Sequence, residues 1–168
     1  MRWFERRFSF DFPAEMIYVI VERLRGAAPR IEDKVKGLSR DKLIRRDGDK
    51  WSLQEEIGHL LDLDALHIGR LDDYEAGLPT LRAADLSNKR THTANHNSRD
   101  ASELIAEFRG ERNRLIARLE HWQPEKLSQL AVHPRLQQPM RVVDMAFFVA
   151  EHDDHHLARM TQLARMFG

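Results

Sequence analysis

The sequence predicts an all-α protein, a four-helix bundle with a long crossover between its second and third helices. Three observations lead to this fold class. Apolar residues recur every three to four positions over four long stretches, which is the period of an amphipathic helix. Capping residues, glycines and prolines mark where these stretches begin and end. The connection between the second and third stretches is the longest, and such a connection allows two successive helices to run parallel.

The first helix is expected over residues 13–36, where apolar side chains follow helical spacing and a proline occupies the first turn. Pro29 is expected to bend or interrupt this helix because proline cannot donate a backbone hydrogen bond. Gly37 is expected to end it. Residues 38–50 then form a polar connection that contains an Asp-Gly-Asp turn signal.

The second helix is expected to begin at Ser52, which forms a capping box with Glu55 three residues later. It continues through regularly spaced apolar residues and stops near Gly77-Leu78-Pro79. Residues 80–100 are rich in Asn, Thr, Ser and His. A connection of this length inside a compact domain usually crosses the bundle or performs a function, so we interpret it as a crossover.

Ser102 is the expected cap of the third helix, and Trp122-Gln123-Pro124 marks the end of that helix. Residues 127–141 contain two prolines and are expected to be irregular or briefly extended. Residues 142–167 are dense in apolar side chains and form the fourth long helix.

Composition narrows the class of protein. The 168 residues fit a single domain over 1–168, and 27 basic side chains balance 27 acidic ones. This balance argues against nucleic acid or an anionic membrane as a partner. Because the chain has no cysteine, a metal ion would have to be held by histidine or carboxylate.

The beginning of the chain does not resemble an export signal. The first seven residues carry a net positive charge, but the apolar stretch that follows is short and is interrupted by acidic residues. No segment approaches the roughly 20 uncharged apolar residues that span a bilayer. We therefore expect a cytoplasmic protein.

Nine histidines invite a search for metal ligands. About 0.4 pairs spaced four residues apart are expected by chance, and two occur, His92/His96 and His152/His156. The first pair lies in the polar crossover, where helical spacing brings no shared face. The second lies on the predicted fourth helix, at the edge of its apolar stripe, whereas His155 falls on the polar side.

A third ligand would have to come from another helix, because a stable site needs at least three protein groups. His59 and His67 are the candidates on the second helix, and periodicity does not choose between them. Gly58 beside His59 weakens the helix, which is easier to understand if another group approaches closely there. The simpler alternative is that these are histidines at the edge of the core, without a ligand.

Two segments resemble the DinB-like superfamily, also called the DinB/YfiT group. They are Trp51-Ser52-Leu53-Gln54-Glu55-Glu56-Ile57-Gly58-His59-Leu60 and Phe148-Val149-Ala150-Glu151-His152-Asp153-Asp154-His155-His156, and the likeness covers most of the chain. Members are four-helix bundles, often dimers, in which one histidine of the second helix and an His-x-x-x-His of the fourth bind a metal. The resemblance implies that His59, His152 and His156 bind one divalent metal ion here, and that the protein forms a homodimer.

The resemblance leaves the reaction open. Some members transfer or isomerise thiol-linked substrates, and others are described as metal-dependent hydrolases, so we expect a small-molecule substrate, with a low-molecular-weight thiol as a candidate partner. Three imidazoles leave a coordination position for water or substrate, and zinc or nickel are the expected metals. Glu56, Asp153 and Asp154 are candidates to orient imidazoles or handle protons, although such carboxylates are more often solvated.

Two other interpretations remain. Glu56-Ile57-Gly58-His59 is a Glu-x-x-His unit of the kind found in ferritin-like di-metal bundles, but the fourth helix lacks a second copy. Alternatively, a metal ion clamps the second helix to the fourth without catalysis, since a bound ligand stabilises the native state. An open coordination position beside a concave pocket would favour an enzyme.

Overall fold

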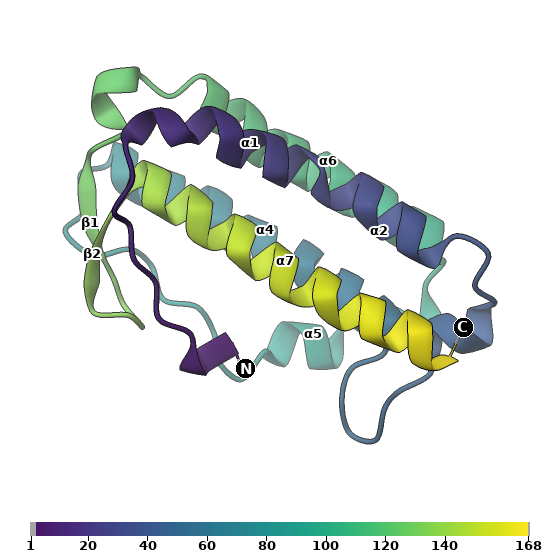
Figure 1. The fold of residues 1–168 in the computed structure, drawn as a ribbon. Helices are drawn as coiled ribbons and strands as arrows, with labels where there is room; N and C mark the ends of the chain where they lie inside the picture. Colours follow the sequence, from purple (N-terminus) through teal and green to yellow (C-terminus); the bar gives the residue numbers. More distant parts are fainter. Residues whose placement is uncertain (1–2, 168) are drawn as a thin grey trace.

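The computed structural model describes residues 3–167 and contains four long helical rods packed side by side (Figure 1). The first rod consists of two helices in tandem. The rods are α1 (Ile17–Arg25) with α2 (Ala27–Val35), α4 (Leu53–Glu75), α6 (Ala101–Glu120) and α7 (Val142–Phe167). Shorter helices are α3 (Arg40–Ile44), α5 (Lys89–Thr93), η1 (Trp3–Glu5), η2 (Ala14–Met16), η3 (His96–Ser98) and η4 (Pro124–Lys126). The predicted fold class is confirmed.

The two middle rods run parallel, as the long crossover predicts. Asp64 of α4 pairs with Arg112 of α6, and Asp72, two turns further on, pairs with Arg118, so both helices advance in the same direction. The segment between them returns along the bundle and includes α5 (Figure 1). Helix α7 runs antiparallel to α4, which brings the middle of α7 beside the first half of α4.

The first helix breaks at Gly26, one turn before the predicted interruption at Pro29. The reason is geometric. A proline cannot donate to the carbonyl four residues earlier, and its ring crowds that group, which here belongs to Arg25, the last residue of α1. Pro29 itself sits in the first turn of α2, where its missing N–H costs nothing.

Other predicted boundaries are partly confirmed. Ser52 caps α4 through a complete capping box with Glu55, and Gly77, with φ 67°, follows the end of that helix. The prediction that Ser102 caps α6 is wrong. Asp100 occupies that position and accepts hydrogen bonds from the backbone N–H groups of the second and third helical residues. The short helix α3 lies within the polar connection at residues 38–50, where no helix was predicted.

A small β-hairpin stands at one end of the bundle, within the stretch expected to be briefly extended. Strands β1 (Leu130–His133) and β2 (Gln138–Arg141) pair antiparallel, with Ala131 opposite Met140. A parallel bridge from Thr80 to Val132 fastens the start of the crossover to the hairpin. The hairpin therefore holds residues 133–136 next to the end of α4.

The core consists of two apolar clusters with a charged layer between them. Arg112 of α6, buried at the middle of the bundle, contacts Asp64 of α4 and Asp153 of α7. A buried charge is tolerated when it is paired and hydrogen-bonded, and this guanidinium meets two carboxylates. The charged layer fixes the relative height of three helices. No helix within residues 3–167 is long and apolar enough to cross a membrane.

Candidate metal centre

Three histidines from two helices converge near the middle of the bundle. His59 of α4 and His152 and His156 of α7 are all buried, and one ligand atom from each lies within 4.8 Å of the other two. The Nε2 atoms of His152 and His156 are 3.1 Å apart. Two imidazole nitrogens on a tetrahedral zinc ion are separated by about 3.3 Å, given bonds of about 2.0–2.1 Å. The spacing of this pair therefore suits a shared ion.

The proton of His59 is positioned by a hydrogen-bonded chain from the crossover. Burial alone would raise the pKa of Asp62, but hydrogen bonds from His96 and Thr91 outweigh it and lower that pKa. Asp62 is therefore an ionised acceptor, and the Thr91 hydroxyl donates its single proton to it over 2.9 Å. Thr91 can then only accept from Nδ1–H of His59, 3.2 Å away. This leaves the Nε2 lone pair of His59 free.

Glu56 holds the ring of His156 in the same manner. Its carboxyl oxygen is 2.5 Å from Nδ1 of His156, so Nε2 of that ring faces His152. Burial raises the pKa of Glu56 to about 7. Nδ1 of His152 is buried without a hydrogen-bond partner among the described residues. The ring of His152 instead lies edge-on against Trp3, with 4.8 Å between ring centroids.

The three imidazoles are neutral at physiological pH. Burial, followed by the proximity of His156, lowers the pKa of His59 to about 3, and burial lowers the pKa of His156 to about 4. Burial also places the pKa of His152 well below its usual range. A metal ion binds the neutral form of histidine, so protons do not compete for these nitrogens near pH 7.

The other histidines do not join the three. His155 is half-buried on the cavity side of α7, between Trp3 and the ring of His156. His92 is exposed. The buried ring of His96 packs against the backbone of α4 and places its Nε2 2.9 Å from Asp62. The pair His92/His96 is therefore no ligand set, as its place in a polar crossover predicts.

Two of the three candidate carboxylates lie elsewhere. Asp153 is paired with Arg112 in the charged layer, and Asp154 with Arg23 and Arg30 on the outside of α7. Of the three, only Glu56 contacts the triad, through Nδ1 of His156. Within residues 3–167 the histidine triad is the one group of three or more potential ligands found together, without a carboxylate member. This composition is unlike the carboxylate-rich shell that the di-metal interpretation requires.

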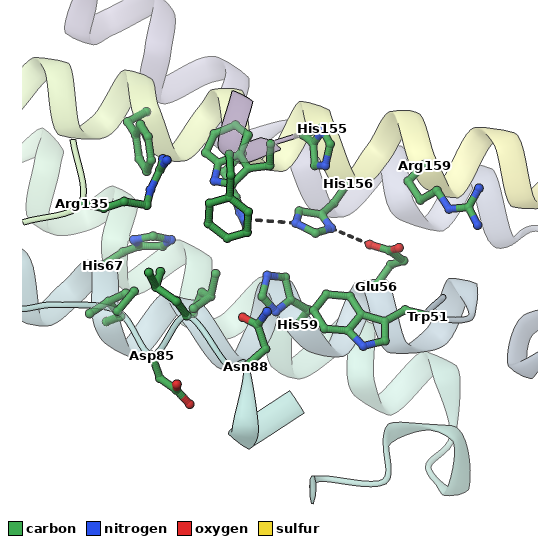
Figure 2. A pocket seen from close by; sticks show the side chains of 18 of the residues that line it. Trp51, Glu56, His59, His67, Asp85, Asn88, Arg135, His155, His156 and Arg159 are labelled. Carbon is green, nitrogen blue, oxygen red and sulfur yellow. Dashed lines mark hydrogen bonds and ion pairs between the residues drawn. The ribbon is translucent and has the colours of Figure 1, made fainter. Parts of the chain in front are cut away.

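The triad opens onto a cavity of about 1190 Å³. Figure 2 shows His59 and His156 facing each other across it, with Trp51, Glu56 and Arg159 toward one end and His67 and Arg135 toward the other. The indole of Trp51 lies over His59, with 4.5 Å between ring centroids. The walls are mainly side chains of α4 and α7, closed by the crossover, the hairpin loop and η1.

Sequence reasoning did not identify Thr91, Asp62 or Trp51 as part of this site. One signal was available for α4. Glu56, His59, Leu63, His67 and Arg70 are spaced three or four residues apart, so they share one face of the helix. Nothing comparable exists for Thr91, because its place beside α4 depends on the path of the crossover.

The sequence profile of the DinB superfamily matches residues 23–160. Among solved structures, the fold is similar to YfiT from Bacillus subtilis, a probable metal-dependent hydrolase with an unusual four-helix bundle topology. That match has a TM-score of 0.80 and 19% sequence identity and covers 96% of this chain and 93% of YfiT. No curated protein matches the sequence significantly. The chain belongs to the DinB superfamily.

Proposed function

We propose that His59, His152 and His156 bind one divalent metal ion, zinc or nickel, and that the protein is a metal-dependent enzyme for a small molecule. The observation that carries this proposal is the convergence of three buried, neutral imidazoles at the wall of a large cavity. Structural zinc sites are closed by four protein ligands, whereas catalytic sites use three and keep one position open. Three donors beside open space match the second arrangement.

The ligand atoms need little movement to share an ion. Their largest separation is at most 4.8 Å, against about 3.3 Å in a tetrahedral site, so a ring shift of about 1.5 Å or less closes the difference. Thr91 and Glu56 hold the Nδ1 atoms of two rings, which fixes the nitrogen that each presents. Metal-binding histidines commonly have such a partner on their other nitrogen.

The chain's own residues would supply orientation and proton transfer. A divalent ion held by His59, His152 and His156 would lower the pKa of bound water toward about 7 or ionise an incoming thiol. Glu56, with its pKa raised to about 7, can hold or release a proton near neutral pH while it touches His156. Trp51, Trp3 and Phe148 give the cavity apolar walls on which a substrate can lie.

Two reactions use the same three ligands. Transfer to a low-molecular-weight thiol is one proposal, and the size of the cavity accommodates a thiol and an acceptor together. Hydrolysis is the other, and it is compatible with the likeness to YfiT, which is described as a probable metal-dependent hydrolase. A non-catalytic role, in which the metal ion clamps α4 to α7, is the alternative to both reactions, and the open cavity disfavours it.

Metal content tests the ligand assignment. Replacement of His59, His152 or His156 by Ala is expected to lower the bound metal, measured by elemental analysis after dialysis, from one ion per chain to near zero. His155→Ala is the matched control, since it removes a neighbouring cavity histidine outside the triad. Unchanged metal content in all three triad variants, or an equal loss in the control, would refute the assignment.

Activity of the metal-loaded protein separates the reactions. One panel combines low-molecular-weight thiols with electrophiles, and the other contains esters and amides. Turnover in one panel alone, absent from the metal-free protein and from His152→Ala, identifies the chemistry. Silence in both panels, together with a metal-dependent rise in melting temperature, would instead support the clamp.

A further inference from the structure

One end of the cavity holds four cationic or hydrogen-bond-donating side chains that have no carboxylate partner among the described residues. Arg70 and His67 come from α4, His133 from β1, and Arg135 from the loop between the two strands. Burial lowers the pKa of Arg70 to about 10 and also lowers the pKa of Arg135. Within residues 3–167, neither guanidinium lies within ion-pair distance of an Asp or Glu. Asp73, the acid whose charge acts on Arg70, is instead held by Arg82.

Arg112 provides the internal comparison. It is as buried as Arg70, at 2% exposure each, and it is enclosed by two carboxylates. Arg70 by contrast uses only its Nε, which donates to the carbonyl of Arg82 over 3.2 Å. Its two Nη groups have no acceptor among the described residues. A buried guanidinium without an anion is costly, so proteins seldom keep one for packing.

The neighbouring donors are unsatisfied too. Nδ1 of His133 accepts the backbone N–H of Leu136 over 3.2 Å, and burial keeps this histidine neutral by lowering its pKa to about 3. The ring proton must then be on Nε2, which is buried without an acceptor in the described part of the chain. Nη2 of Arg135 and Nδ1 of His67 are likewise buried without partners among residues 3–167. Buried polar groups are normally paired, so this concentration calls for a missing acceptor.

The cluster lies beside the histidine triad. His67 is two helical turns from His59 on the same face of α4. Phe148 touches the ring of His133, the guanidinium of Arg135 and the indole of Trp3, and Trp3 in turn contacts His152. Figure 2 shows Arg135 and His67 together, on the opposite side of the triad from Arg159. A small molecule could thus reach both places at once.

Aromatic contacts do not replace the missing anion. Arg135 lies over Trp3, Phe4 and Phe148, with 5.3 to 5.9 Å from its Cζ to the ring centroids. Such contacts are attractive, but an aromatic face does not accept the in-plane N–H groups as an oxyanion does. A guanidinium held flat by rings has its fork pre-oriented for a carboxylate or phosphate.

We propose that Arg70, Arg135 and His133 form an oxyanion subsite that binds the carboxylate or phosphate group of the substrate beside the histidine triad. As a statement about the substrate, this rests on the proposed function; as a statement about binding, it does not require the metal. The oxyanion subsite would narrow the substrate class to small anionic molecules in which the reactive group lies within about the length of one side chain of the charged group.

The test measures anion binding to the metal-free protein. Inorganic phosphate and acetate are titrated at constant ionic strength and pH 7. Binding is followed by calorimetry and by tryptophan fluorescence, to which Trp3, in contact with Arg135, contributes. Saturable binding is expected for at least one probe. Arg70→Met and Arg135→Met should each weaken it at least tenfold. Arg159→Gln is the matched control, because Arg159 lines the same cavity but is paired with Asp47.

Stability distinguishes a binding role from a structural one. Arg70→Met is expected to keep or raise the melting temperature, since it removes an unpaired buried charge. Arg135→Met, at a half-buried loop position, tests the subsite if the first variant misfolds. Absence of saturable binding of both probes by the wild type, or an equal loss in Arg159→Gln, would overturn the proposal. Preferential binding of phosphate or of acetate identifies the group recognised.

The proposed subsite and the proposed metal site can be refuted independently of each other. Both arginine variants should retain the metal content of the wild type, because neither side chain contacts the triad. His59→Ala should lose the metal and still bind the anion. A protein that binds phosphate or acetate but no metal would sustain the subsite and refute the proposed metal centre.

Discussion

Replacement of Gly58 by alanine tests whether the crossover is fastened to α4 in the way that the structure shows. A Cβ atom at this position would lie 2.2 Å from Cγ and Cδ2 of the His96 ring and 2.6 Å from its Nδ1. These are atoms of a rigid ring, not the end of a flexible chain. An ordinary contact begins near 3.4 Å, so the ring must retreat by about 1.2 Å, the difference between 3.4 and 2.2 Å.

The retreat has two costs and one gain. Overpacking costs about 1–3 kcal/mol, and detaching His96 from buried Asp62, 2.9 Å away, costs about 1–3 kcal/mol more. Alanine recovers about 1 kcal/mol relative to glycine in a helix. The midpoints give a net loss of about 3 kcal/mol in the free energy of unfolding.

Gly110→Ala is the matched control. Gly110 lies in the middle of α6, and a Cβ there meets nothing within 4 Å. This variant should gain about 0.5–1 kcal/mol through helix propensity alone. Urea denaturation followed by circular dichroism, with unchanged m-values, measures both variants. If Gly58→Ala were as stable as Gly110→Ala, the close packing of His96 on α4 would be wrong.

Three further predictions concern the site and the charged layer. Thr91→Val should lower the affinity for zinc about 10–100-fold in a chelator competition, with Thr91→Ser near the wild type, because the His59 ring loses the acceptor for its Nδ1–H. Arg112→Met should lower the free energy of unfolding by about 3–5 kcal/mol, since two buried carboxylates lose their partner; unchanged stability would contradict the pairing. Acidification of the metal-free protein from pH 6 to pH 5 should lower its stability, because His59 and His156 have pKa values of about 3 and 4 when folded and take up protons only on unfolding. Glu56, with its pKa raised to about 7, changes stability with pH in the opposite direction. Two histidines less one carboxyl leave a loss of about 1.4 kcal/mol in the free energy of unfolding per pH unit, to which the other buried histidines add. A urea midpoint that stays constant across this range would contradict these pKa shifts.

The features of the fold that the sequence predicts correctly are local ones. The capping box at Ser52 involves two residues three apart, and the period of the last helix repeats over 26 residues. The parallel order of α4 and α6 follows from the length of the crossover alone. The errors also have local causes. Pro29 interrupts the helical hydrogen bonds at the carbonyl of Arg25, four residues before it. Asp100, two residues before Ser102, is the N-cap of α6.

The candidate site likewise has one part that local sequence patterns predict and another that they do not. His152 and His156 are related by one helical turn, so periodicity places them on a common face. The choice between His59 and His67 came from resemblance, because both are buried on the same face of α4 and differ only in which part of α7 lies opposite. The structure brings His59 opposite His152 and His156 and leaves His67 among the arginines. That difference depends on helix register, which the charged layer around Arg112 determines.

This register has a consequence for the cavity. Arg112, Asp64 and Asp153 satisfy one another in the interior. The next charged residue on α4, Arg70, faces the cavity and has no ion-pair partner within the described residues. The chain has as many acidic as basic residues, so a shortage of carboxylates does not explain the exception. A cation kept unpaired beside three neutral imidazoles creates a local positive potential in a low-dielectric space, which attracts an anion to the place where a metal ion would act.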